Sequence, residues 1–119
     1  LNKSGENCIM YCWHSVAGVS AFGTYDGNST AGTTITTGFP PSYVLLKSRS
    51  SGDSWFIYDN VRVASGTRMD KKLNADASGN ESADGSIGVT LETDDGFTLH
   101  GTNSETNGAG DFYIYAAFA

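Results

Sequence analysis

Basic residues are scarce in this chain: 7 Lys and Arg stand against 13 Asp and Glu in 119 residues, a formal net charge of −6. This balance argues against nucleic acid as a partner, because a binder needs clustered Lys and Arg to neutralise phosphates. It also argues against an anionic membrane surface. No apolar run approaches the ~18 residues of a transmembrane helix, so membrane insertion is not expected.

Cysteine is almost absent, and the two present, Cys8 and Cys12, lie in one apolar run. If that run is a strand, their Cα atoms are about 13 Å apart at about 3.3 Å per residue, whereas a disulfide needs about 7 Å or less. A zinc site needs about four ligands, and only His14 is nearby. We therefore expect no disulfide and no metal, and predict that both cysteines are small buried apolar side chains.

Long helix-forming stretches are also lacking, whereas 15 Gly and many Ser, Thr, Asn and Asp punctuate short apolar runs. This pattern is typical of an all-β domain. Short strands every eight to twelve residues favour a single antiparallel two-sheet β-sandwich over residues 1–119, jelly-roll or concanavalin A-like, with little or no helix. Strands are expected within residues 8–13, 14–25, 33–37, 43–48, 55–59, 68–73, 87–93, 97–100 and 111–119.

The clearest hairpin joins residues 43–48 and 55–59 across a polar turn. Residues 68–73 indicate one short edge strand, 74–85 a long mobile surface loop without core residues, and 101–110 a polar loop. Alternation places every second residue of a strand on one face. It groups Ile35 inward, Ile87 with Val89 and Leu91, and, in the last strand, Phe112, Ile114, Ala116 and Phe118.

The two ends of the chain echo each other at a shift of 105 positions. Residues 2–13 and 107–118 each contain a polar turn with Gly followed by an apolar run, and Asn2, Gly5 and Ile9 coincide with Asn107, Gly110 and Ile114. The echo predicts one closing strand written twice. Residues 1–13 would then be the closing strand of a preceding module, or a strand offered to a neighbouring chain.

Chemical motifs are weak, and we expect no enzyme, no catalytic residue and no cofactor. The Asp94-Asp95-Gly96 turn and the loop holding Asp76 and Asp84 match no calcium motif, so solvated turns are favoured over a calcium site. His14, which lies beside Ser15, and His100 could in principle belong to a catalytic triad, but the sequence contains no nucleophile elbow.

Large aromatic rings offer the one candidate ligand site. A carbohydrate site commonly stacks a sugar on such a ring while a carboxylate holds its hydroxyls. Trp55 with the nearby Asp53 is therefore the predicted ligand-binding pair, although core packing is the favoured role for Trp55 itself and for Trp13.

Residues in order along nearly the whole chain resemble a recurrent domain of tailed-phage virion proteins, best represented among phages of marine bacteria and cyanobacteria. They are residues 1–6, Tyr11-Cys12-Trp13, Val16, Gly18, Ser20, Phe22-Gly23, Tyr25, Gly27-Asn28, Thr37-Gly38-Phe39, Pro41, residues 44–47, residues 55–59, Arg62, residues 96–99 and residues 113–119. The match departs at residues 7–10 and 63–84.

The resemblance implies a β-sandwich similar to concanavalin A-like or laminin G-like domains, in a tail fibre, spike or other extracellular surface protein of the virion. Its partners would be other virion proteins and further copies of itself, a trimer being common in fibres, and a bacterial surface glycan as receptor. The alternative is a self-assembling extracellular filament or adhesin subunit that exchanges strands between chains.

Overall fold

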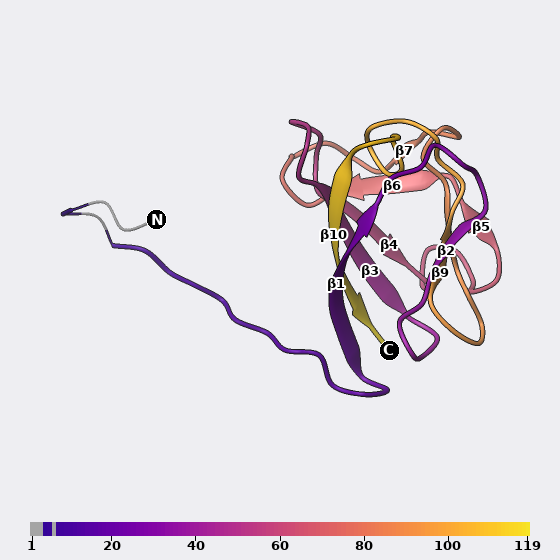
Figure 1. The fold of residues 1–119 in the computed structure, drawn as a ribbon, viewed down its shortest axis with the longest axis horizontal. Helices are drawn as coiled ribbons and strands as arrows, with labels where there is room; N and C mark the ends of the chain where they lie inside the picture. The colour runs from indigo at the N-terminus through magenta and orange to yellow at the C-terminus, as the bar shows by residue number, and fades with distance from the viewer. Residues whose placement is uncertain (1–3, 6) are drawn as a thin grey trace.

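Two antiparallel sheets form the domain. The computed structural model describes residues 4–5 and 7–119, and within them it has ten strands and no helix (Figure 1). One sheet has the order β1-β10-β3-β4-β6-β7 and the other β2-β9-β8-β5, which confirms the predicted all-β, two-sheet sandwich. The strands are β1 (Ser20–Asp26), β2 (Thr33–Ile35), β3 (Tyr43–Ser48), β4 (Phe56–Asp59), β5 (Arg68–Met69), β6 (Lys71–Asn74), β7 (Ser82–Ala83), β8 (Val89–Leu91), β9 (Phe97–Leu99) and β10 (Phe112–Phe118).

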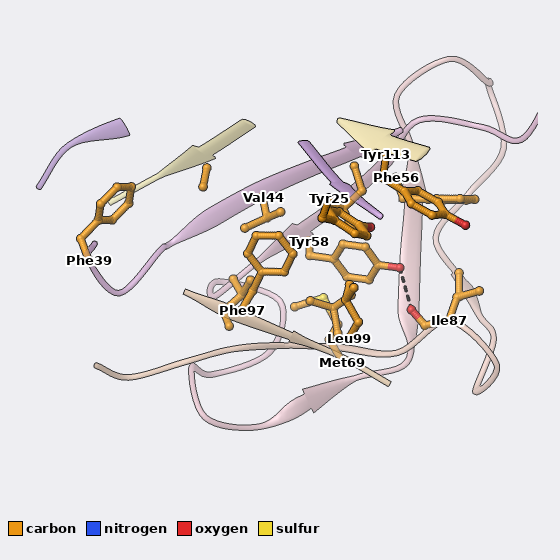
Figure 2. Close-up of a cluster of buried hydrophobic side chains, with 14 residues drawn as sticks. Tyr25, Phe39, Val44, Phe56, Tyr58, Met69, Ile87, Phe97, Leu99 and Tyr113 are labelled. Carbon is orange, nitrogen blue, oxygen red and sulfur yellow. Dashed lines mark hydrogen bonds between the residues drawn. The ribbon is translucent and has the colours of Figure 1, made fainter. Parts of the chain in front are cut away.

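The core lies between the sheets because alternate residues of each strand point inward. The six-stranded sheet contributes side chains such as Val44, Tyr58 and Tyr113, and the four-stranded sheet contributes others such as Phe97 and Leu99, all fully buried (Figure 2). The Tyr58 hydroxyl donates a hydrogen bond of 2.9 Å to the Ile87 carbonyl. A hydrogen bond to a buried hydroxyl offsets the cost of removing it from water, so the core tolerates this tyrosine.

Several strand predictions are confirmed in detail. β3 and β4 form the expected antiparallel hairpin, with Leu45 opposite Ile57. Ile35 packs against the core from β2. Ile87, Val89 and Leu91 are all buried. Alternation and a polar turn are local properties of the sequence. In these strands the pairing and the burial seen in the structure match the local pattern.

The predicted single edge strand over residues 68–73 is wrong. Arg68–Met69 pairs with β8 in the four-stranded sheet, whereas Lys71–Asn74 pairs with β4 in the six-stranded sheet. The chain changes sheets at Asp70, whose carboxylate accepts from Arg68 Nε at 2.6 Å and whose carbonyl accepts from the Asp84 N–H. Asp70 is therefore a corner of the sandwich rather than the middle of a strand.

The loop predicted over residues 74–85 contains an additional short strand, β7, which pairs with Lys71 and Lys72. Its residues are exposed, as the sequence predicts. Ion pairs surround it: Glu81 Oε2 lies 2.9 Å from Arg62 Nη1, and Asp84 Oδ2 lies 3.4 Å from Lys72 Nζ. Charges of opposite sign on the flanking residues therefore help to hold this edge in place.

The polar loop over residues 101–110 is confirmed as a loop, yet its centre is buried. Asn107 is fully buried, and its side-chain amide donates to the carbonyls of Thr30 and Gly101 and to Asn28 Oδ1, while its own oxygen accepts from the Asn28 N–H. The Tyr25 hydroxyl donates to the Thr106 carbonyl at 2.7 Å. This network ties the loop before β10 to the loop after β1.

The predicted N-terminal strand within residues 8–13 is wrong. Residues 7–15, here called the arm, form no strand, and every one of them is exposed. The arm projects away from the two sheets (Figure 1). Its apolar run gains no burial because, in the single chain, no second sheet surface lies on either side of it. The predicted burial of Cys8, Cys12 and Trp13 fails for the same reason: both cysteines are exposed free thiols, and Trp13 is 66% exposed.

Candidate functional site: the arm and the outer face

The side of the six-stranded sheet that faces away from the core carries a row of apolar side chains. Residues directly opposite each other in neighbouring strands share a face. The pairing therefore aligns one residue from each of five adjacent strands, Phe22, Ala116, Leu45, Ile57 and Leu73. All five are only partly buried. Together with Tyr43, Ile114 and Phe118, which lie on the same side, they form what we call the outer face.

The last strand explains how this face arises. Ile114, Ala116, Phe118 and Phe112 share one side of β10, as predicted, but that side points outward, whereas Tyr113 and Ala117 are fully buried on the core side. β10, which lies between β1 and β3, is apolar on both sides. An apolar residue at every position of a strand is the sequence signal that could have revealed an apolar outer face.

A depression of about 470 Å³ opens in the outer face over β1, β10 and β3. Its lining is almost wholly apolar: Trp13, Phe22, Gly23, Thr24, Leu45, Trp55, Ile114, Tyr115 and Ala116. Gly23 leaves room for Tyr115, which packs against the core: a Cβ at position 23 would lie 2.8 Å from the Tyr115 ring. The size falls in the range of pockets that accept small molecules or single large side chains.

The structure separates the two predicted ligand-binding residues. Trp55 lines the depression and is 37% exposed, so the favoured core role for this residue is wrong. Asp53 is not among the lining residues; its carboxylate accepts from the Ser51 hydroxyl at 2.5 Å, and its carbonyl accepts from Lys47 Nζ. Asp53 thus shapes the β3–β4 turn, while Trp55 borders the depression.

The root of the arm contacts β1 through a short turn and two serine side chains. Val16 and Ser20 form an isolated antiparallel bridge across a three-residue turn. Beyond it, the Phe22 N–H donates to Ser15 Oγ at 3.0 Å, and Ser20 Oγ donates to the His14 carbonyl at 3.3 Å. Backbone groups that would continue a hairpin ladder are therefore bonded to hydroxyls, and the ladder ends.

Aromatic rings connect the arm to the outer face. The ring of Trp13 stacks on Phe22 at 6.4 Å between centroids, and Tyr11 stacks on Trp13 at 6.0 Å. Phe22 in turn meets Phe118 edge-on at 5.5 Å. The arm and the outer face are therefore one continuous apolar surface, although most of the arm has no cover.

Two of the titratable residues named from the sequence, Asp95 and His100, have side-chain hydrogen-bond partners. Asp95 Oδ1 accepts from the N–H groups of Thr37 and Gly38. His100 Nε2 lies 2.9 Å from Thr90 Oγ1, and burial together with the charge of Arg68 lowers the pKa of its imidazole. Within residues 4–5 and 7–119 no three His, Cys, Asp or Glu side chains form a cluster that could hold a metal ion.

Comparison with known proteins identifies the family. A model of the family described as "Domain of unknown function (DUF7483)" matches residues 1–119. The chain belongs to this family. Neither a curated protein nor a solved structure matches it. Among the residues described, no helix is long and apolar enough to cross a membrane.

Proposed function

We propose that this domain is a non-enzymatic structural module of a tailed-phage virion surface protein, in a tail fibre or spike, and that it assembles through its outer face and arm. The virion context is supported by the resemblance of ordered residues along nearly the whole chain. The assembly role is supported by one observation above all, the apolar outer face that remains open in the single chain.

The size of this surface supports the proposal. Exposed apolar side chains that occur singly need no explanation, but a contiguous patch usually marks an interaction site. Here the apolar side chains run across five neighbouring strands and continue into the arm. Covering them with protein gains about 25 cal/mol for each Å² of apolar surface removed from water.

Glycan binding at Trp55 and Asp53 stays a prediction from the sequence. A sugar needs polar groups around its hydroxyls, whereas the depression beside Trp55 is lined mainly by apolar side chains. Contact with apolar protein surface is the use that this lining supports best.

The second candidate is a self-assembling extracellular filament or adhesin subunit. The observation that favours it is the arm, an extended apolar segment that its own sheets leave unpaired. Both candidates need association between chains, and they differ in where the protein is found. Mass spectrometry of purified virions, with antibody labelling of the particles, decides between them: a protein absent from the virion and present on the cell surface contradicts the phage proposal.

Association itself is tested with a charge on the outer face. Leu45→Glu puts a carboxylate beside Ala116 and Ile57, so it should raise the dissociation constant of the assembled species at least tenfold by light scattering after size exclusion. Val61→Glu is the matched control, because Val61 is 91% exposed and lies outside the outer face. Equal association of both variants and the parent chain, or a monomer at all concentrations, contradicts the assembly role.

A further inference from the structure

Two features of the structure complement each other: the arm is an apolar segment that pairs with no sheet, and one sheet has an edge open to a further strand. Residues 7–15 have no backbone ladder, and four of their large side chains are at least 66% exposed: Ile9, Met10, Tyr11 and Trp13. On the same molecule, β1 is an edge strand: β10 pairs with one side of it, and on the other side the described residues add only the bridge from Val16 to Ser20. The arm lacks a strand to pair with, and the free edge of β1 lacks a partner strand.

β1 is the edge best suited to receive a strand. It has seven residues, whereas the other edge strands, β7, β2 and β5, have two or three. Hydrogen bonds flanking its ladder join Gly27 to Asp111 and Ala119 to Val19. In an antiparallel pair these bonds recur at every second residue, so the backbone groups of Thr24 and Asp26 point to the free side. β1 carries one charged residue, Asp26, at its end. An open edge of this kind is a template for strand addition.

The arm also has the composition of a strand that β1 accepts. β10 pairs with β1 along its whole length, and the arm repeats the β10 pattern of a Gly-containing turn followed by an apolar run. Gly5 and Gly110, which coincide in the two segments, both have a positive φ, 83° and 81°. β10 therefore shows that a strand with this pattern can pair with β1.

The arm's own chain does not accept it. The hairpin at Val16 and Ser20 starts to return the arm along β1, but the hydroxyls of Ser15 and Ser20 take up the next backbone groups. From there the arm leaves the sheet (Figure 1). The arm is therefore left uncovered by the two sheets of its own domain.

We propose that the arm docks on a second copy of this chain, antiparallel to the free edge of its β1, with its apolar side chains over the depression of its outer face. This rests on the proposed assembly function and names the partner and the surface. The exchange is reciprocal, so the interface has a twofold axis. The exposed apolar side chains of one arm amount to roughly 400 Å². Each arm also covers an area of about the same size on the partner chain. Two arms therefore bury on the order of 1,600 Å² in total, which is the size of a stable specific interface.

The arm carries its own probes, since Cys8 and Cys12 are exposed free thiols. Thr24→Cys adds a thiol at the free edge of β1, and mild oxidation should convert most of this variant to a covalent dimer on a non-reducing gel. Ser82→Cys, on β7 at the opposite edge of the same sheet, is the matched control and should give at least tenfold less. Adding Cys8→Ser and Cys12→Ser to Thr24→Cys should abolish the dimer.

Three outcomes overturn the proposal. An intrachain disulfide in monomeric Thr24→Cys means that the arm folds onto its own β1. Equal crosslinking through Thr24→Cys and Ser82→Cys means random collision. No disulfide to the arm means that it docks elsewhere. If the parent chain still associates in these cases, the assembly function stands and only the arm's site fails; a parent chain that is monomeric at every concentration removes both.

A second measurement is independent of thiols. Ile9→Asp with Tyr11→Asp charges the arm without touching either sheet, so it should convert the dimer to monomer in sedimentation velocity while the midpoint of thermal unfolding of the monomer stays the same. A dimer that persists with both charges present contradicts docking of the arm.

Discussion

The arm and β10 have the same pattern but opposite structures. Both follow a turn whose glycine has a positive φ, and both are apolar through six or more residues. β10 lies between β1 and β3 and buries Tyr113 and Ala117 completely, whereas the arm has no strand partner and Tyr11 is 73% exposed. The sequence pattern therefore determines the local turn and the β-propensity of a segment. Only a neighbouring strand supplies the backbone hydrogen bonds and the burial of its side chains.

The largest expected difference between these segments concerns their tyrosines. Tyr113→Ala removes a ring stacked 4.8 Å from Tyr25 and a hydroxyl that accepts from the Gly108 N–H and donates to the Ser104 carbonyl. It should lower the free energy of unfolding by about 3–5 kcal/mol. Tyr11→Ala, in the arm, should change it by less than about 0.5 kcal/mol. Chemical denaturation at concentrations where the chain is monomeric measures both.

Tyr113→Phe keeps the ring and removes only the hydroxyl, in case the alanine variant does not fold. It should cost about 1–3 kcal/mol, because the buried Gly108 N–H loses its acceptor. Burial raises the pKa of the Tyr113 hydroxyl to about 12, so the hydroxyl stays protonated and able to donate across the neutral range. Equal costs at Tyr113 and Tyr11 would show that the two segments are alike after all.

The next difference lies in the loop that precedes β10. Asn107→Ala removes a buried amide with four hydrogen bonds and leaves the Asn28 N–H without its acceptor. The free energy of unfolding should fall by about 2–4 kcal/mol. Asn80→Ala, in an exposed loop, is the control and should be neutral within about 0.5 kcal/mol. A neutral Asn107→Ala would mean that β10 is held by its neighbouring strands alone.

Acid should destabilise one edge of the six-stranded sheet more than the other. Arg62 hydrogen bonds hold the pKa of Glu81 below its usual value, Ser86 hydrogen bonds do the same for Asp84, and at Asp59 the hydrogen bonds and charge of Arg62 outweigh an opposing effect of burial. A carboxyl with a lowered folded pKa adds stability that is complete above its unfolded pKa, near 3.8 for Asp and 4.5 for Glu, and that is lost as the pH falls through the folded value.

The β4–β6–β7 edge, where these carboxyls lie, should therefore open first below about pH 4, while the β1–β10 pair keeps its amide protection. Hydrogen exchange followed by NMR from pH 6 to pH 3 measures this order. Simultaneous loss of protection at both edges would contradict it. The effect is the smallest of the three, because these ion pairs lie at the surface, where solvent screens them.

The sequence is informative where local patterning and the fold agree. The β3–β4 hairpin follows from alternation and a polar turn, and the inward position of Ile35 follows from its polar neighbours. The corner at Asp70 could not be predicted, because the run from Arg68 to Leu73 contains no Gly or Pro to mark a break and only the distant partners β8 and β4 divide it. The short strand β7 depends in the same way on Lys71 and Lys72.

The candidate site was harder to predict for a related reason. Trp55 was expected mainly in the core, and the depression that it lines combines residues from β1, β3 and β10 that look like core residues in the sequence. Which side of a strand faces the core depends on the register between strands. Single residues in one sequence do not carry that register, so Phe22 and Ile114 could not be assigned to the outer face in advance.

The antiparallel pairing of β1 with β10 has a mechanical consequence. Ser20, at the start of β1, lies opposite Phe118, at the end of β10. A tensile force applied through these two residues would pull both strands from the same end, so the interstrand hydrogen bonds would carry the load one after another instead of all together. The pair would peel open like a zip at low force. A module of this geometry tolerates tension along its chain only where a neighbour bridges that end and shares the load.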